Sequence, residues 1–240
     1  MPRHGQLVRW GVTVAALTVL VAGCGVTGTD TLSDRPALDG AITAVRIDND
    51  SGAITVTGGT GAPTLERTLR YRGSAPSGPT HRIEGGTLVL GGCGYNCGVD
   101  YVLRVPAGLP VSGRTSAGAI SLTEVGKVDV ETSSGAIELS GTDAVRAHTS
   151  NGAITGRGLR GGGIDATTSN GRIELTLAAA QDVRATTSNG AIDLTVPGGG
   201  YRVRTETTNG SQDVRVPNDP AGAHTLELVT SNGSVTVAPA

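Results

Sequence analysis

The sequence T-S-N-G-A-I occupies residues 149–154, and it recurs as T-S-N-G-R-I at 168–173 and as T-S-N-G-A-I at 187–192. Variants of this motif extend the series in both directions. The glycines of the full set are separated by 17, 17, 19, 19, 20 and 23 residues, and they are Gly118, Gly135, Gly152, Gly171, Gly190, Gly210 and Gly233. A period of this length indicates a repeat protein, in which each unit packs on its neighbours.

Each repeat carries alternating aliphatic residues on both sides of the motif. The seventh residue before the glycine is Val, Ile or Leu in every unit, and the second residue after it is Ile or Val in all units but one. Alternation with a period of two predicts a β-strand on each side. The Ser-Asn-Gly segment predicts a corner where Asn or Gly adopts a positive φ. Since these units are too short for a strand–helix–strand crossover, we expect an all-β, single-stranded parallel β-helix, or β-solenoid.

Equivalent residues of successive coils in such a stack lie about 4.8 Å apart and form ladders. Ladders of amides and hydroxyls satisfy the hydrogen bonds of their side chains within the stack. We therefore assign the polar residues of the motif a structural role rather than a catalytic one. These residues are Thr132, Thr149, Thr168 and Thr187, together with Asn151, Asn170, Asn189, Asn209 and Asn232.

The N-terminal half follows the same pattern less regularly. Alternating aliphatic residues surround Gly52 and Gly86, and further coils are expected near residues 65–71 and 101–105. One domain over residues 41–240 would then contain about ten coils and form a rod on the order of 45 Å long. A solenoid needs its ends covered, and we expect the cap in the N-terminal region or in a partner.

Residues 1–23 have the features of an export signal. Arg3 and Arg9 precede an apolar run of 13 residues, which is too short to span a bilayer. The run ends in V-A-G-C, which resembles the lipobox of bacterial lipoproteins. We expect a lipoprotein signal peptide over 1–23, lipid attachment such as palmitate at Cys24, and a flexible tether over 24–40. A plain secretory signal with an incidental cysteine is the alternative.

Composition argues against several classes of function. Aromatic residues make up 2% of the chain, and cleavage before Cys24 removes two cations and no anions, so the net charge changes from -2 to -4. An acidic chain with few aromatic platforms is not expected to bind nucleic acid. The chain contains no nucleophile elbow, no His-Glu-x-x-His and no phosphate-binding loop. We therefore expect neither an enzyme nor a bound cofactor.

Cys93 and Cys97 remain once Cys24 is assigned to lipid. They lie in the segment C-G-Y-N-C and can form a disulfide across a short loop in an oxidising compartment. Free thiols are the alternative. A zinc site is not indicated, because the chain has no second pair of cysteines.

Two columns of charge are expected on the outer surface. Three residues after the motif glycine lie Glu174, Asp193 and Asp213, which would stand about 5 Å apart if successive repeats stack in order. Carboxylates this close repel each other or recruit a cation, so the column is a weak candidate for a calcium or glycan site. The simpler interpretation is a surface column of acids whose mutual repulsion is reduced by neighbouring arginines. The second column mostly alternates in sign, and it contains Asp129, Arg146, Asp165, Arg184, Arg204 and Glu227.

The lipobox, the two cysteines followed by V-D-Y-V-L-R-V-P at 99–106, and the serial T-S-N-G-A-I-x-L coils resemble a family of bacterial envelope proteins described as adhesins with β-strand repeats. The resemblance implies a right-handed β-solenoid on the cell surface without catalytic residues. We expect a non-enzymatic protein, anchored by lipid to the outer face of the bacterial cell membrane, that acts as an adhesin, scaffold or interaction module for an envelope protein or glycan. Calcium or glycan binding by the acidic column, with glycan cleavage the weaker case, is the alternative function.

Overall fold

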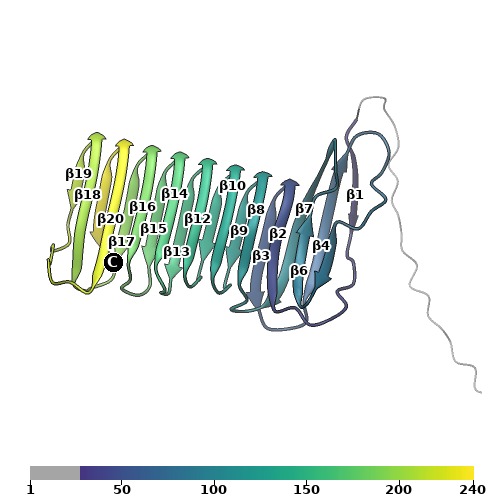
Figure 1. Ribbon diagram of the computed structural model, residues 1–240, viewed down its shortest axis with the longest axis horizontal. Coiled ribbons are helices and arrows are strands. Elements are labelled where there is room, and N and C mark those ends of the chain that lie inside the picture. The colour runs from purple at the N-terminus through teal and green to yellow at the C-terminus, as the bar shows by residue number, and fades with distance from the viewer. Residues whose placement is uncertain (1–27) are drawn as a thin grey trace, which may run out of the picture.

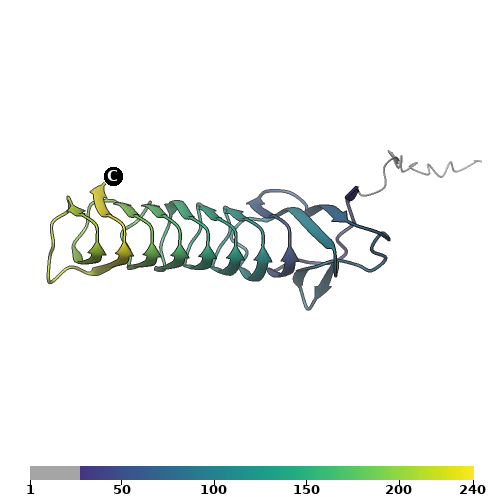
Figure 2. The same ribbon diagram turned by 90° about the horizontal axis from the view of Figure 1, so that it is seen from above.

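The computed structural model describes residues 28–240, which form 21 strands and no helix. The strands belong to an eleven-stranded and a ten-stranded sheet, which face each other along an elongated rod (Figures 1 and 2). Nearly all pairings between strands are parallel. The prediction of an all-β parallel solenoid is therefore confirmed. Within residues 28–240 there is no helix with the length and apolar character needed to cross a bilayer.

Each regular coil contributes one strand to each sheet. The pairs are β8 (Val111–Ala117) with β9 (Ile120–Thr123), β10 (Val128–Ser134) with β11 (Ile137–Ser140), β12 (Val145–Asn151) with β13 (Ile154–Leu159), β14 (Ile164–Asn170) with β15 (Ile173–Leu177), and β16 (Val183–Asn189) with β17 (Ile192–Val196). The register joins equal positions of the repeat, so that Thr132 lies opposite Thr149 and Ile137 opposite Ile154. The T-S-N-G corners consequently lie in a row along one edge of the rod, the upper edge in Figure 1.

The last two coils do not stack in chain order. They consist of β18 (Tyr201–Asn209) with β19 (Gln212–Val214), and β20 (His224–Asn232) with β21 (Val235–Pro239). Strand β20 lies between β16 and β18, and β21 lies between β17 and β19. The chain thus builds the outermost coil first and returns to fill the place inside it (Figure 1). The expectation that successive repeats are neighbours was wrong here, because the spacing of a repeat does not specify which coil packs on which.

The N-terminal end shows the same inversion and is closed by antiparallel strands. The coil of β2 (Ala44–Ser51) and β3 (Ile54–Gly59) lies between the β8–β9 coil and the coil of β6 (Thr87–Gly91) and β7 (Cys97–Pro106). Beyond β7 lie β4 (Thr64–Tyr71) and then β1 (Asp30–Asp34), while β5 (His81–Glu84) lies beyond β6, all in antiparallel pairing. These strands form a cap in the N-terminal region.

Three local expectations differ from the structure in this region. Residues 65–71 were expected to form a coil, but they belong to β4, whose antiparallel pairing makes it part of the cap. Gly86 is not a corner between sheets, because β5 and β6 form a hairpin around Gly85 and Gly86, both with positive φ. The expected tether over 24–40 includes β1, which is paired with β4.

The interior is aliphatic along its length, with a tyrosine at each end. Tyr101 on β7 and Tyr201 on β18 are both 1% exposed. The Tyr101 hydroxyl lies 2.5 Å from the carbonyl oxygen of Thr80 and 2.7 Å from that of Gly91, and burial raises the pKa of this phenol to about 12. The Tyr201 hydroxyl donates to the carbonyl oxygen of Pro197 at 2.9 Å. The narrow regular coils between them leave no room for rings, which explains the low aromatic content.

The corner glycines are required because backbone segments approach closely. A Cβ atom on Gly152 would lie 1.9 Å from the carbonyl oxygen of Gly135, and one on Gly171 would lie 2.0 Å from that of Gly152. A positive φ is found at Gly118 and Gly233 among the motif glycines, and at none of the motif asparagines. The prediction of a positive φ at each corner was therefore wrong, and steric contact between coils is the reason for glycine instead.

Candidate functional site

The side chains of the threonine and asparagine ladders form hydrogen bonds between neighbouring coils. The hydroxyls of Thr132, Thr149, Thr168 and Thr187 each donate, at 3.0–3.2 Å, to the carbonyl oxygen of the motif glycine one coil away. The side-chain amides form one chain of 3.0 Å hydrogen bonds, which runs in the order Asn209, Asn232, Asn189, Asn170 and Asn151. These groups are engaged between coils, and the threonines are buried. This arrangement indicates that the two ladders hold the coils in register, and it does not indicate a catalytic role.

The acidic column is interrupted. Glu174 lies beside Asp193, but Thr236 of the intercalated strand β21 lies between Asp193 and Asp213. The expectation of three neighbouring carboxylates was therefore wrong, because the stacking order separates Asp213 from the other two.

Each of these acids also has its own arginine. Glu174 lies 3.3 Å from Arg157 and Asp193 lies 2.8 Å from Arg172, while Asp213 pairs with Arg215, which lowers the pKa of the Asp213 carboxyl through a hydrogen bond. No group of three or more His, Cys, Asp or Glu side chains within residues 28–240 is arranged to hold a metal ion. The geometry thus gives the calcium alternative no support.

A second column, on the outer face of the ten-stranded sheet, has a regular pattern of charge. Its order in space is Asp129, Arg146, Asp165, Arg184, Glu227 and Arg204. The intercalation of β20 places Glu227 between two arginines, so the signs alternate at every step. Arg184 lies 2.9 Å from Glu227, and Arg146 lies 3.8 Å from Asp165.

A groove of about 560 Å³ runs across this column. Its surface includes the charged residues from Asp129 to Glu227, with Lys127, Asp182 and Thr225 near the points where the strands begin. The Asp182 carboxylate accepts a hydrogen bond of 2.7 Å from the backbone N–H of Thr225, which links two neighbouring coils at this border. We call this feature the charged groove. It follows the edge of the rod opposite the T-S-N-G corners and presents both signs of charge to solvent.

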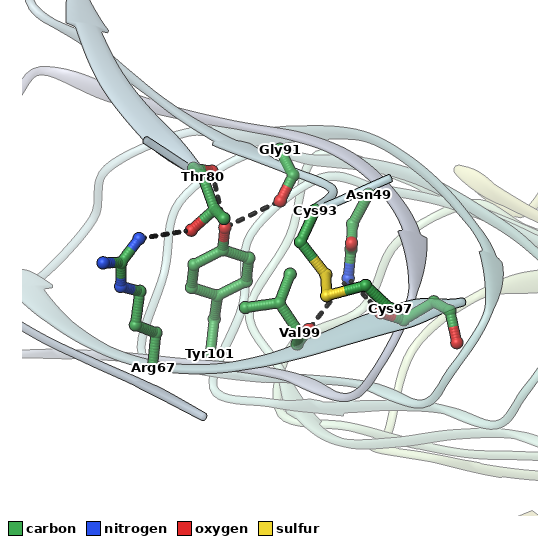
Figure 3. The surroundings of a disulfide bond; sticks show 9 residues. Asn49, Arg67, Thr80, Gly91, Cys93, Cys97, Val99 and Tyr101 are labelled. Carbon is green, nitrogen blue, oxygen red and sulfur yellow. Dashed lines mark hydrogen bonds between the residues drawn. A yellow bond between two sulfur atoms is a disulfide. The ribbon is translucent and has the colours of Figure 1, made fainter. Parts of the chain in front are cut away.

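The N-terminal cap contains the ion pair with the least exposed side chains among the described residues. The Arg67 guanidinium on β4 donates two hydrogen bonds, of 2.6 and 2.7 Å, to the carboxylate of Asp34 on β1, and a third of 2.9 Å to the Thr80 hydroxyl. Figure 3 shows Arg67 and Thr80 beside the buried Tyr101. The hydrogen bonds from Arg67 lower the pKa of the Asp34 carboxyl, and burial lowers the pKa of nearby His81. This contact ties the first strand to the rest of the cap.

The ion pair predicts a pH-dependent contribution to stability. Because the Asp34 pKa is lower in the folded chain than its ordinary value of 3.8, the contribution is complete above that value and is lost as the pH falls through the folded pKa. We expect Asp34→Asn to lower the free energy of unfolding by about 1 kcal/mol near pH 7 and by less than that near pH 2.5. Urea unfolding of both proteins at each pH measures this. Glu66→Gln serves as the control, because it removes the partner of Arg35 from an ion pair that is more exposed than that of Asp34 and Arg67. An equal difference at both pH values would contradict the prediction.

In the coil of β6 and β7, which is the last parallel coil before the N-terminal cap, a disulfide loop stands in place of the T-S-N-G corner. Cys93 and Cys97 are bonded, with their Cα atoms 5.6 Å apart, in the loop that joins β6 to β7. Beneath it, the Asn49 side-chain amide donates to the carbonyl oxygens of Val99 and Ser51 (Figure 3). Between the cysteines, the side chain of Tyr95 is 95% exposed. Sequence reasoning missed this tyrosine, although its position inside a bridged loop is the signal that could have identified it.

Of the predicted functional positions, Cys24 lies outside the described residues. The signal peptide expected over 1–23 lies outside them as well.

The family described as Toastrack DUF4097 matches residues 39–238. No curated protein matches the chain. Among solved structures, a protein described as a putative adhesin from Bacteroides fragilis is similar, with a TM-score of 0.52 and 11% identity over 88% of this chain and 97% of that one. A protein described as a putative cell adhesion protein from Clostridium sporogenes has a TM-score of 0.42 and 10% identity over 89% of this chain and 100% of that one. At such identity the first likeness supports the fold alone. The match over residues 39–238 confirms the family resemblance, and the chain belongs to the Toastrack DUF4097 family.

Proposed function

We propose that this protein is a non-enzymatic adhesion module of the bacterial cell surface, anchored by a lipid on Cys24, which binds an extended envelope polymer along the charged groove. The observation that carries the proposal is the groove itself. It crosses several coils and alternates in charge at every step, with Asp129, Arg146, Asp165, Arg184 and Glu227 along it.

The spacing of the groove suits a polymer better than a small molecule. Neighbouring parallel strands repeat at about 4.8 Å, so the groove presents the same backbone and alternating charges at a constant interval. An open groove of this kind does not enclose a small ligand, whereas a glycan or an extended protein segment can contact several coils at once. Individual exposed ion pairs contribute under about 1 kcal/mol each to stability, so their side chains can exchange partners at little cost.

The surface location is supported by two observations. The lipobox-like V-A-G-C segment precedes the domain, and a solved structure with a similar fold is described as a putative adhesin. A rigid rod attached at one end is suited to present a binding edge away from the membrane. The long stack supplies this rigidity, because each coil is hydrogen-bonded to its neighbours in both sheets.

A charge-reversal experiment tests the groove. Beads carrying the Cys24→Ser chain should be retained on isolated bacterial envelopes, and Arg146→Glu with Arg184→Glu should weaken retention at least about tenfold, because the reversal makes five neighbouring side chains acidic. Arg157→Glu with Arg172→Glu is the matched control, since it changes the net charge equally and both arginines form cross-coil pairs with acids of the opposite sheet, Glu174 and Asp193. Circular dichroism verifies that both variants are folded. Equal retention of wild type and the double variant in the groove would refute binding there.

A further inference from the structure

Three segments that are distant in sequence converge at one corner of the rod. Asp30 lies opposite Tyr71, and Tyr71 lies opposite Cys97, so the start of β1, the end of β4 and the disulfide loop are neighbours. The backbone N–H of Arg72 donates to the carbonyl oxygen of Asn96 at 3.1 Å, and its guanidinium donates to the Thr29 hydroxyl at 3.4 Å. In Figure 1 this corner lies at the upper right, where the described chain begins.

The surface of this corner is unusual for the protein. Its two loops, residues 72–80 and 92–96, contain Gly, Ser, Ala, Pro, Thr, Cys, Asn and Tyr, and Arg72 is the single charged residue in them. Tyr95 is the most exposed large apolar side chain within residues 28–240, whereas Tyr101 and Tyr201 are buried. Positive φ values at Gly94 and Asn96 form the tight turn that presents Tyr95, and the disulfide closes the base of the loop. The ring is therefore displayed on a short, braced support.

The length of chain before β1 identifies what this corner faces. Six residue steps separate Cys24 from Asp30, a reach of at most about 20 Å. With a lipid on Cys24, as in the proposed function on which this inference rests, the corner cannot move farther than that from the bilayer. Tyrosine is enriched at membrane–water interfaces, where its ring lies at the level of the headgroups. We propose that this corner docks on the bilayer surface with the Tyr95 ring among the headgroups.

The tether makes a weak contact sufficient. Linking two contacts turns the second one into an intramolecular event with an effective concentration in the millimolar range for a short linker. A single inserted ring can then fix the orientation of the rod without binding membranes strongly by itself. The lipid holds the protein on the membrane, and Tyr95 decides which corner touches it.

Charge contributes little to this contact. The cation of Arg70 is paired with Asp100, and the corner that contains Arg72 also holds two acids, Asp30 opposite Tyr71 and Asp50 beside Gly92. The corner therefore has no excess of positive charge with which to select anionic lipids. Docking is expected on zwitterionic bilayers and at high salt, which separates it from electrostatic adsorption.

The mature chain offers a direct reporter of this contact. The only tryptophan of the full sequence, Trp10, lies in the predicted signal peptide, so Tyr95→Trp makes the indole at the tip of the loop the single tryptophan of the mature chain. The lipid-bearing variant is reconstituted into phosphatidylcholine vesicles. We expect its emission to shift to shorter wavelength relative to the protein in solution, and to be quenched by lipids brominated near the headgroups. Val214→Trp, on β19 at the far end of the rod and 39% exposed in the native chain, should show neither effect.

The outcomes separate docking from anchoring. If the chain is labelled with palmitate and Cys24→Ser abolishes this labelling, the lipid anchor is established independently of Tyr95. If the chain is labelled but Tyr95→Trp retains the emission of a solvent-exposed indole on vesicles, docking is overturned while the anchor stands. A shift that disappears at 1 M salt would also overturn the proposal, because it would assign the contact to charge. A shift that persists at high salt, with no shift at Val214→Trp, supports it.

Discussion

Truncation of the chain after Gly222 is expected to unfold the coil that precedes the cut, rather than only to remove the end of the rod. Strands β18 and β19 pack on β20 and β21, and the truncation deletes both of these. Four completely buried side chains disappear with them, and they are Leu226, Leu228, Val235 and Val237. Burial of each aliphatic side chain is worth roughly 1.5–3 kcal/mol, so the loss amounts to several kcal/mol.

Limited proteolysis and thermal unfolding measure this effect. We expect residues 201–214 to be cleaved rapidly in the chain that ends at Gly222, and we expect this chain to melt at the same temperature as one that ends at Val196. Direct docking of β18 on β16 is unfavourable, because it would place Arg204 against Arg184 where Glu227 normally separates them. Protection of residues 201–214 in the chain that ends at Gly222 would show that the two coils are interchangeable and would contradict this prediction.

Replacement of Gly152 by alanine is expected to destabilise the rod strongly although it adds a single methyl group. The added Cβ atom would lie 1.9 Å from the carbonyl oxygen of Gly135, and that oxygen belongs to the backbone. Relief of the clash would require neighbouring coils to separate locally, which would also strain the hydrogen bond from Thr149 to Gly135. We expect a loss of about 3 kcal/mol, the upper part of the range for overpacking.

The matched control for this substitution is Gly198→Ala. Nothing lies within 4 Å of a Cβ atom at Gly198, and its φ is outside the left-handed range. Alanine there should leave the free energy of unfolding unchanged within about 0.5 kcal/mol, with a small gain because the unfolded chain loses freedom. Urea unfolding compares the two variants. A similar, small effect at both positions would mean that the corners are not closely packed.

The regular part of the fold could be predicted because its information is local. Alternation with a period of two assigns each side chain to the inside or the outside, and the residues two after the motif glycines, such as Ile120, Ile137 and Ile154, are indeed buried. The same alternation describes any half-buried strand, however. It could not distinguish the antiparallel strand β4 from a further coil, since the direction of pairing depends on segments far away in the sequence.

For a related reason, the repeat alone could not predict the order in which the terminal coils stack. The T-S-N-G residues make the same contacts between every pair of neighbouring coils, so the motif does not specify which coil packs on which. One trace of the true order was present in the charges. Read along the chain, Arg184, Arg204 and Glu227 break the alternation, whereas the order Arg184, Glu227, Arg204 restores it.

The candidate surfaces were only partly accessible from the sequence. The charged column was identified, but the charged groove requires the strand starts near Lys127, Asp182 and Thr225 to be brought together by stacking. The corner that displays Tyr95 requires the start of β1, the end of β4 and the disulfide loop to meet, and β1 fell in a stretch expected to be a tether.

The inverted order of coils at both ends also restricts how such a protein can change its length in evolution. Duplication or loss of a whole repeat between β8 and β17 leaves both inverted ends intact, because the coils from β8–β9 to β16–β17 stack on one another in chain order. Addition of a repeat after β21 would begin from a coil that is already enclosed on both sides. Homologous rods of different length should therefore differ by units of 17–20 residues in their middle, while the two ends are inherited as fixed modules.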